Sequence, residues 1–238
     1  MLKIGHRGAS GVAPENSKAA FLKAIEFGLD MVELDIQLTK DNNLIVFHDY
    51  DLKRITGLDR KVGGMTLAEL KKVDIGSCFS KEFNNERILT LAEVIDLLKG
   101  KMKINIEIKI NQQKSDVIIE SLFDILEEQE YEDEVIISSF DHRILKVIKR
   151  KKPSLKTAVL IGAIVMEPIR LIQEASADGI HPHYLTISKE LVEELKDYGY
   201  FINTWTVNSK EEVDRLVEIG VDGIMSDYPM LITKAVKR

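Results

Sequence analysis

The sequence has few of the features that mark disulfide-bonded, membrane-spanning or disordered chains. Its only cysteine, Cys78, excludes an internal disulfide and is typical of a reducing compartment. No apolar run approaches the roughly 20 residues that a membrane span needs. Residues 1–7 lack the apolar core of a signal peptide. We therefore expect a cytoplasmic protein without stable membrane insertion.

Basic residues are also in the minority. The chain has 33 Lys+Arg against 39 Asp+Glu, a net charge of −6, and this acidic balance argues against nucleic acid as a partner. With 45% hydrophobic and 30% charged residues, the composition is that of a folded globular protein. Because no linker rich in proline or serine divides the 238 residues, we expect a single domain over residues 1–238.

Short apolar segments alternate with amphipathic segments along most of the chain. We expect strands at Leu2–His6, Met31–Gln37, Lys103–Lys109, Glu134–Ser139, Leu155–Leu160, Asp178–His181, Tyr200–Thr204 and Asp222–Met225. We expect helices at Ser17–Phe27, Leu91–Lys99, Lys114–Glu128, His142–Lys149, Glu167–Glu174, Lys189–Lys196, Lys210–Glu218 and Met230–Val236. This alternation predicts an α/β fold, a closed (β/α)8 TIM barrel, with a doubly wound open sheet as the alternative.

One segment interrupts the alternation. Leu44–His48 follows Met31–Leu38 too closely for a parallel crossover, so the two segments should form an antiparallel hairpin. A two-residue turn at Asn42 and Asn43 would place His48 opposite Gln37, near Asp35. Residues 49–89 then contain several glycines and one short expected helix, and we expect a small insertion subdomain at the C-terminal face of the barrel. We expect this segment to shape substrate choice without supplying an essential catalytic group.

Acidic side chains alternate with apolar ones on two of the expected strands. Glu33 and Asp35 share one face of their strand, and Glu107 lies on the corresponding face of another. The apolar faces must meet the helices, so these carboxylates should point into the barrel. Their oxygen donors suit Mg²⁺, Ca²⁺ or Mn²⁺ better than zinc. The alternative is that Glu33 and Glu107 pair with nearby basic residues, namely Arg7, Lys103 or Lys109.

Two histidines end strands near this acidic cluster. His6 ends the first expected strand, and His48 ends the hairpin. Histidine has the pKa that general acid–base catalysis needs near neutral pH, and we expect His6 to be the base and His48 the acid. Arg7 can bind a phosphate with two nitrogens, and Lys109 can add positive charge.

Several segments resemble the motifs of glycerophosphodiester phosphodiesterases, in the same order along the chain. They are His6–Ser17, Glu33–Asp41, Val46–Asp49, Glu107–Lys109, Ser138–Phe140, Asn203–Asn208 and Gly223–Pro229. The resemblance implies a barrel enzyme that uses a divalent cation, Mg²⁺ or Ca²⁺, to hydrolyse glycerophosphodiesters to sn-glycerol 3-phosphate and an alcohol.

The resemblance also implies roles for individual residues. It gives Glu33, Asp35 and Glu107 as metal ligands, and His6 and His48 as the catalytic pair. It gives Arg7 and Lys109 as phosphate contacts, and Phe140 and Trp205 as pocket residues that could instead belong to the barrel core. Glu15 is expected near the glycerol or the metal, unless it caps the following helix.

Two other functions remain open from the sequence. One is a phosphoinositide-type phospholipase or lyase, and the other is a catalytically silent module that binds glycerol phosphates. The sequence selects neither the released alcohol, nor Mg²⁺ over Ca²⁺, nor an oligomeric state. A second metal site at His181 and His183 is compatible with their spacing, but we do not expect one.

Overall fold

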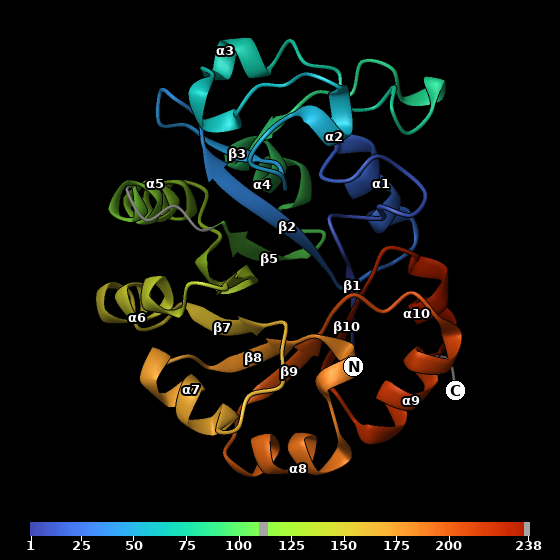
Figure 1. The fold of residues 1–238 in the computed structure, drawn as a ribbon, viewed down its shortest axis with the longest axis vertical. Helices are drawn as coiled ribbons and strands as arrows, with labels where there is room; N and C mark the ends of the chain where they lie inside the picture. The colour runs from blue at the N-terminus through green and yellow to red at the C-terminus, as the bar shows by residue number, and fades with distance from the viewer. Residues whose placement is uncertain (110–113, 236–238) are drawn as a thin grey trace.

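Residues 1–109 and 114–235 are described by a computed structural model, and they contain a closed barrel of eight parallel strands (Figure 1). The strands are β1 (Leu2–Gly5), β2 (Met31–Leu38), β5 (Lys103–Ile108), β6 (Val135–Ser139), β7 (Lys156–Ile161), β8 (Gly179–Pro182), β9 (Phe201–Thr204) and β10 (Gly223–Ser226). β1 pairs in parallel with both β10 and β2, which closes the sheet. The predicted TIM barrel is confirmed, and the open-sheet alternative is wrong.

Helices form an outer ring around this barrel (Figure 1). They are α1 (Lys18–Glu26), α4 (Leu91–Leu98), α5 (Ser115–Glu128), α6 (His142–Lys151), α7 (Pro168–Ala175), α8 (Lys189–Asp197), α9 (Lys210–Ile219) and α10 (Pro229–Ala235). Their ends agree with the sequence prediction to within two residues, and Val236 lies outside the described residues. No helix in the described part of the chain is long and apolar enough to cross a membrane.

The hydrophobic core lies between the barrel and the helices. Val32, Leu34 and Ile36 of β2 are fully buried in it, together with the alternate isoleucines of β5. Fully burying each such side chain contributes about 1.5–3 kcal/mol to stability. Because successive residues of a strand point to opposite faces, the residues between them face the barrel interior. This alternation places the polar side chains of β2 and β5 inside the barrel.

The hairpin has the expected strands but a different register. β3 (Leu44–Val46) pairs antiparallel with β2, and Gln37 lies opposite Ile45 rather than His48. The chain turns through residues 40–42, with Asn42 in the left-handed conformation at φ 61°. Asparagine tolerates that conformation, so a three-residue turn replaces the predicted two-residue turn, which is wrong. The ladder continues to Phe47, whose N–H donates to the carbonyl oxygen of Asp35 at 2.9 Å.

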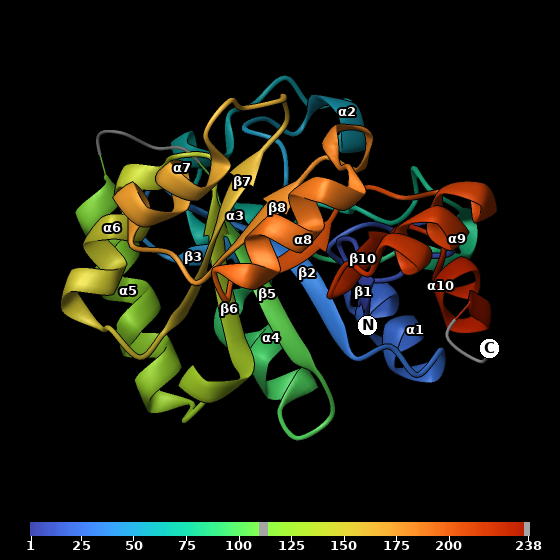
Figure 2. The same ribbon diagram turned by 90° about the horizontal axis from the view of Figure 1, so that it is seen from below.

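The segment after β3 has a hydrophobic cluster of its own. It contains α2 (Lys53–Thr56), α3 (Leu67–Leu70) and the 3-10 turns Val62–Gly64 and Lys81–Phe83, and it returns to β3 through β4 (Leu89–Thr90). The buried members of the cluster are Ile45, Phe47, Leu52, Val62, Met65, Leu70, Val73, Ile75 and Ile88. Figure 2 shows α2 and the loop between β7 and α7 beyond the same end of the barrel. This is the end at which the parallel strands finish and at which active sites of such barrels form.

Candidate active site

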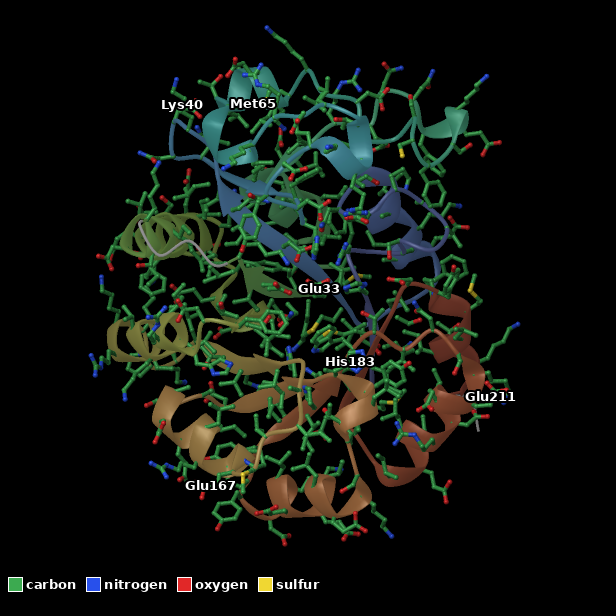
Figure 3. The ribbon with its side chains drawn as sticks, in the orientation of Figure 1. Glu33, Lys40, Met65, Glu167, His183 and Glu211 are labelled. Atoms are coloured by element: carbon green, nitrogen blue, oxygen red, sulfur yellow. The ribbon has the colours of Figure 1, made fainter. Side chains whose placement is uncertain are left out.

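Three carboxylates converge inside the barrel. Glu33 and Asp35 project from β2, and Asp35 is in register with Glu107 of the neighbouring strand β5. One oxygen from each of the three lies within 4.8 Å of the others. Figure 3 shows Glu33 near the middle of the barrel, whereas Glu167 and Glu211 lie on the outer ring. The convergence that the strand periodicity predicts is therefore present.

Burial and the neighbouring charges together give these carboxylates unequal affinities for protons. Burial, with the negative charge of Asp35, raises the pKa of Glu33 and of Glu107. Burial also opposes ionisation of Asp35, but the charges of Lys109 and Arg7 outweigh it and hold the pKa of Asp35 below its usual range. Lys109 Nζ lies 2.8 Å from Asp35 and 2.7 Å from Glu107, so the alternative of pairing with basic neighbours holds in part.

Arg7 crosses the site just after β1. Its backbone is left-handed, at φ 54°, and its N–H donates to Oε2 of Glu33 at 2.9 Å. Its Nη1 donates to Glu15 at 3.0 Å, and its Nε lies 3.6 Å from Asp35. The buried Nε makes no hydrogen bond with the described residues. This guanidinium therefore retains a donor for a ligand in the site.

His6 is held by a carboxylate from the opposite end of the chain. Its Nδ1 lies 2.7 Å from Oδ1 of Asp227, an oxygen that also accepts from Ser10 at 2.9 Å, while Oδ2 of Asp227 accepts from Asn208 at 2.6 Å. Burial opposes ionisation of Asp227, but its hydrogen bond with His6 outweighs this and lowers its pKa to about 2. An ionised carboxylate only accepts hydrogen bonds, so Nδ1 of His6 carries the proton of this contact. The other ring nitrogen, Nε2, lies 4.0 Å from Glu33.

His48 has a matching arrangement. Its Nδ1 lies 2.6 Å from Oδ1 of Asp49, the next residue in the chain. Gln37 anchors the backbone on both sides of the histidine, because its amide donates to the carbonyl oxygens of Phe47 and Asp49, each at 2.8 Å. The buried side chain of Gln37 thus fixes the position of His48 even though the register differs from the one predicted.

The two histidines differ in their proton affinity. Burial lowers the pKa of His6, but the hydrogen bond with Asp227 and the charge of Glu33 outweigh it, so this pKa is raised. Burial lowers the pKa of His48 despite the charge of Asp35, and the positive charges of Arg7 and Lys109 lower it further. The same site thus holds one histidine that retains a proton more strongly than free imidazole and one that releases it more readily.

These side chains surround a small cavity of about 70 Å³. Eight of the predicted site residues line it: His6, Arg7, Glu33, His48, Glu107, Lys109, Phe140 and Trp205. The rings of Phe140 and Trp205 meet edge to face at 5.7 Å. A more open hollow of about 310 Å³, lined by His48, Tyr50 and Phe140 among others, lies beside it. Glu15 lies outside both hollows, where it binds Arg7 and Arg54, and Ser17 caps α1 instead.

Sequence reasoning missed several polar partners of this site. Asp49, Arg54 and Asp227 act on the predicted residues through hydrogen bonds, and Asn16 donates to Asp35 at 2.9 Å. Asp49 and Asp227 both lie in segments that carry the family resemblance, which was the available signal. Arg54 had no such signal.

The His181 and His183 pair does not form a metal site within the described residues. His181 is fully buried in the barrel, and burial lowers its pKa to about 3. His183 packs its ring against Trp205 at 5.3 Å. In the described part of the chain, the group that could hold a metal is the carboxylate cluster of Glu33, Asp35 and Glu107.

This chain is similar to known phosphodiesterases in sequence and in structure. A glycerophosphodiester phosphodiesterase of Caldanaerobacter subterraneus subsp. tengcongensis is 42% identical over 238 residues, which cover 100% of this chain and 98% of that protein. One from Bacillus altitudinis is 36% identical and covers 96% of both chains. A phosphodiesterase of Oleispira antarctica, solved with the product sn-glycerol 3-phosphate, superposes with a TM-score of 0.95 at 30% identity, over 100% of this chain and 97% of that one.

The sequence profile of the glycerophosphoryl diester phosphodiesterase family matches residues 6–231, a range that starts at His6 and includes Asp227. With relatives this similar along nearly its whole length, the chain belongs to the glycerophosphoryl diester phosphodiesterase family.

Proposed function

We propose that the protein hydrolyses glycerophosphodiesters to sn-glycerol 3-phosphate and an alcohol, using a divalent cation and the pair His6 and His48. The observation that carries this proposal is the placement of the two histidines in one cavity with Glu33 and Glu107 of the carboxylate cluster. Each histidine is held at Nδ1 by an aspartate, so each has Nε2 left for proton transfer. The product in the Oleispira antarctica enzyme supports glycerol phosphate as the ligand class.

The charges of the site favour a bound cation. Six carboxylates lie in the network of ion pairs around the site, but only three side chains in this network carry a permanent positive charge. The carboxylates are Glu15, Glu33, Asp35, Asp49, Glu107 and Asp227, and the cations are Arg7, Arg54 and Lys109. Unpaired buried carboxylates are costly, and oxygen donors alone suit Mg²⁺ or Ca²⁺. Glu33, Asp35 and Glu107 would hold the ion, which supplies positive charge beside the phosphate when bound.

Arg7 and Lys109 are the groups of this chain that suit the phosphate. Both line the cavity, and the Nε of Arg7 lacks a hydrogen bond there. A guanidinium can bind two phosphate oxygens, and an ammonium adds a point charge that favours an oxyanion. The phosphate would then lie between the two histidines.

We assign the base to His6 and the acid to His48. His6 takes a proton from the attacking oxygen, either the glycerol 2-hydroxyl or a water, and His48 gives one to the departing alcohol oxygen as its P–O bond breaks. If the 2-hydroxyl attacks, water then opens the cyclic phosphate, and the 2-hydroxyl oxygen leaves with a proton. The charge of Glu33 contributes to the raised pKa of His6, so a cation held by Glu33 favours the neutral form that a base needs. The positive charges of Arg7 and Lys109 lower the pKa of His48. A phosphate bound between them offsets these charges and so favours the protonated form that an acid needs.

Product release tests the function directly. The wild-type protein is incubated with glycerophosphocholine, with and without EDTA, and sn-glycerol 3-phosphate is measured with a coupled dehydrogenase. We expect release that EDTA abolishes and Mg²⁺ or Ca²⁺ restores. A glycerophosphoinositol arm separates hydrolysis from the lyase alternative, because a lyase stops at a cyclic phosphate. Binding of sn-glycerol 3-phosphate without any turnover would support the silent module instead.

A further inference from the structure

Arg54 lies outside the barrel, in the four-residue helix α2, yet it contacts two carboxylates at the active site. Its Nε and Nη2 donate to Asp49 at 2.6 and 3.1 Å. Its Nη1 and Nη2 donate to Glu15 at 2.9 and 2.6 Å. The planar guanidinium therefore binds both carboxylates with two hydrogen bonds each, a geometry that a lysine cannot reproduce.

Each of these carboxylates holds a residue of the proposed chemistry. Asp49 contacts Nδ1 of His48 at 2.6 Å, and Glu15 accepts from Nη1 of Arg7 at 3.0 Å. Arg54 is thus the shared partner of the group that holds His48 and the group that holds Arg7. Without a cation between them, the two carboxylates would repel each other and lose their fixed orientation.

The backbone around Arg54 is anchored without the Arg54 side chain. Leu52, which precedes α2, is fully buried in the hydrophobic cluster of the segment, and Gly57 ends the helix in the left-handed conformation at φ 75°. The side chain of Arg54 itself is 48% exposed. Ion pairs at such exposure contribute little to stability, so the fold does not require this contact.

We propose that Arg54 is a positioning residue for the reaction, which aligns His48 through Asp49 and Arg7 through Glu15. This inference rests on the proposed function, because it assumes that His48 and Arg7 act on the phosphodiester. It also means that the inserted segment contributes to catalysis through Arg54, a residue that lines neither of the two hollows.

Two substitutions separate orientation from charge. Arg54→Gln removes the charge, and Arg54→Lys keeps the charge but loses the paired hydrogen bonds. Arg170→Gln is the matched control, since Arg170 also pairs with two glutamates but on the outer helix α7. We expect both Arg54 variants to lose on the order of 10–100-fold in kcat on glycerophosphocholine, with thermal unfolding close to that of the control.

The readouts identify the path of the effect. Because Arg54 aligns His48 through Asp49, Arg54→Gln should cost little further kcat in the background of Asp49→Asn. With the p-nitrophenyl ester of glycerol 3-phosphate, whose leaving group needs little protonation, the loss in kcat should shrink, whereas a rise in KM through Arg7 should remain. Full kcat in Arg54→Lys, or additive losses with Asp49→Asn, would overturn the inference.

A spectroscopic measurement keeps this inference separate from the proposed function. Nitrogen-15 NMR of the histidine rings in the wild-type protein should show His48 protonated at Nδ1, and Arg54→Gln should mix its tautomers whereas Arg170→Gln should not. An unchanged His48 signal in Arg54→Gln overturns the positioning role, whatever the substrate. Lack of phosphodiesterase activity in the wild type, with the tautomer effect present, overturns the proposed function and leaves Arg54 as the residue that orients His48.

Discussion

The Nδ1 atom of His6 lies 2.7 Å from Oδ1 of Asp227, so the histidine after the first strand is held by a carboxylate 221 residues further along the chain. His48 obtains an equivalent partner, Asp49, from the next residue at 2.6 Å. In both cases a carboxylate orients the ring and fixes which nitrogen carries the proton. Two histidines that follow different strands, β1 and β3, thereby present the same nitrogen for proton transfer.

Asp227→Asn tests the first of these contacts. The amide can still accept a hydrogen bond but no longer stabilises a positive ring, so we expect kcat to fall by about 10²–10⁴-fold, the usual scale for an impaired acid or base. Asp214→Asn, on the exposed face of α9, is the control and should keep wild-type rates. Steady-state kinetics on glycerophosphocholine measure both variants. Unchanged kcat in Asp227→Asn would remove His6 from the proposed pair.

The carboxylate cluster predicts dependence on a divalent cation. Asp35→Asn or Glu107→Gln should abolish turnover while the far-UV circular dichroism stays native, because the cluster is polar and the surrounding core is unchanged. Calorimetric titration with Mg²⁺ or Ca²⁺ should show binding to the wild type and none to these variants. Full turnover after exhaustive chelation would contradict this prediction.

The raised pKa of Glu33 predicts how the metal-free protein responds to pH. Burial and the charge of Asp35 make folded Glu33 bind a proton that the unfolded chain releases near a pH of about 4.3. Between that value and the raised pKa the folded state binds more protons, so its stability falls as the pH rises. In EDTA, the protein should therefore unfold at a lower temperature near pH 8 than at a pH about two units lower, near pH 6.

Two comparisons isolate the contribution of Glu33 to that dependence. Glu33→Gln should flatten it, because the amide does not titrate, whereas the exposed Glu26→Gln should not. Saturating Mg²⁺ or Ca²⁺ should reverse the trend, since the ion binds the deprotonated carboxylates and stabilises the folded state. An EDTA-treated protein that is more stable at the higher pH would show that Glu33 ionises normally.

The leaving group distinguishes the roles of the two histidines. Each single change to alanine should reduce kcat on glycerophosphocholine by about 10²–10⁴-fold. On a p-nitrophenyl ester the leaving group needs little protonation, so His48→Ala should recover most of the rate and His6→Ala should not. Equal recovery of both variants, or preferential recovery of His6→Ala, would reverse or remove the assignment while the pair itself could stand.

The barrel was predictable because its signals are local. Alternating polar and apolar residues on Met31–Leu38 and Lys103–Ile108 fix which face of each strand packs against the helices, and this also places Glu33, Asp35 and Glu107 inside the barrel. The hairpin register was not predictable in the same way. Asn42 and Asn43 suit either a two-residue or a three-residue turn, and the choice depends on how Asn42 adopts a positive φ beside β2.

Local sequence patterns also could not predict hydrogen-bond partners that are distant in the sequence. Nothing in the spacing of Arg54, Glu15 and Asp49 shows that they meet, because an exposed arginine in a short helix resembles any solvated surface residue. The same holds for Asp227, which follows the last strand and reaches His6 only when the barrel closes. Sequence patterns therefore predicted the groups that face the cavity better than the groups that orient them.

The pairing of β1 with both β2 and β10 sets the order in which the enzyme can become active during its synthesis. The ribosome makes β1 before either of its neighbours and makes β10 after the other barrel strands, so one edge of β1 stays unpaired until β10 has emerged. His6 also lacks its carboxylate until residue 227 has left the exit tunnel. A chain that stops before residue 227 therefore lacks the contact that orients His6.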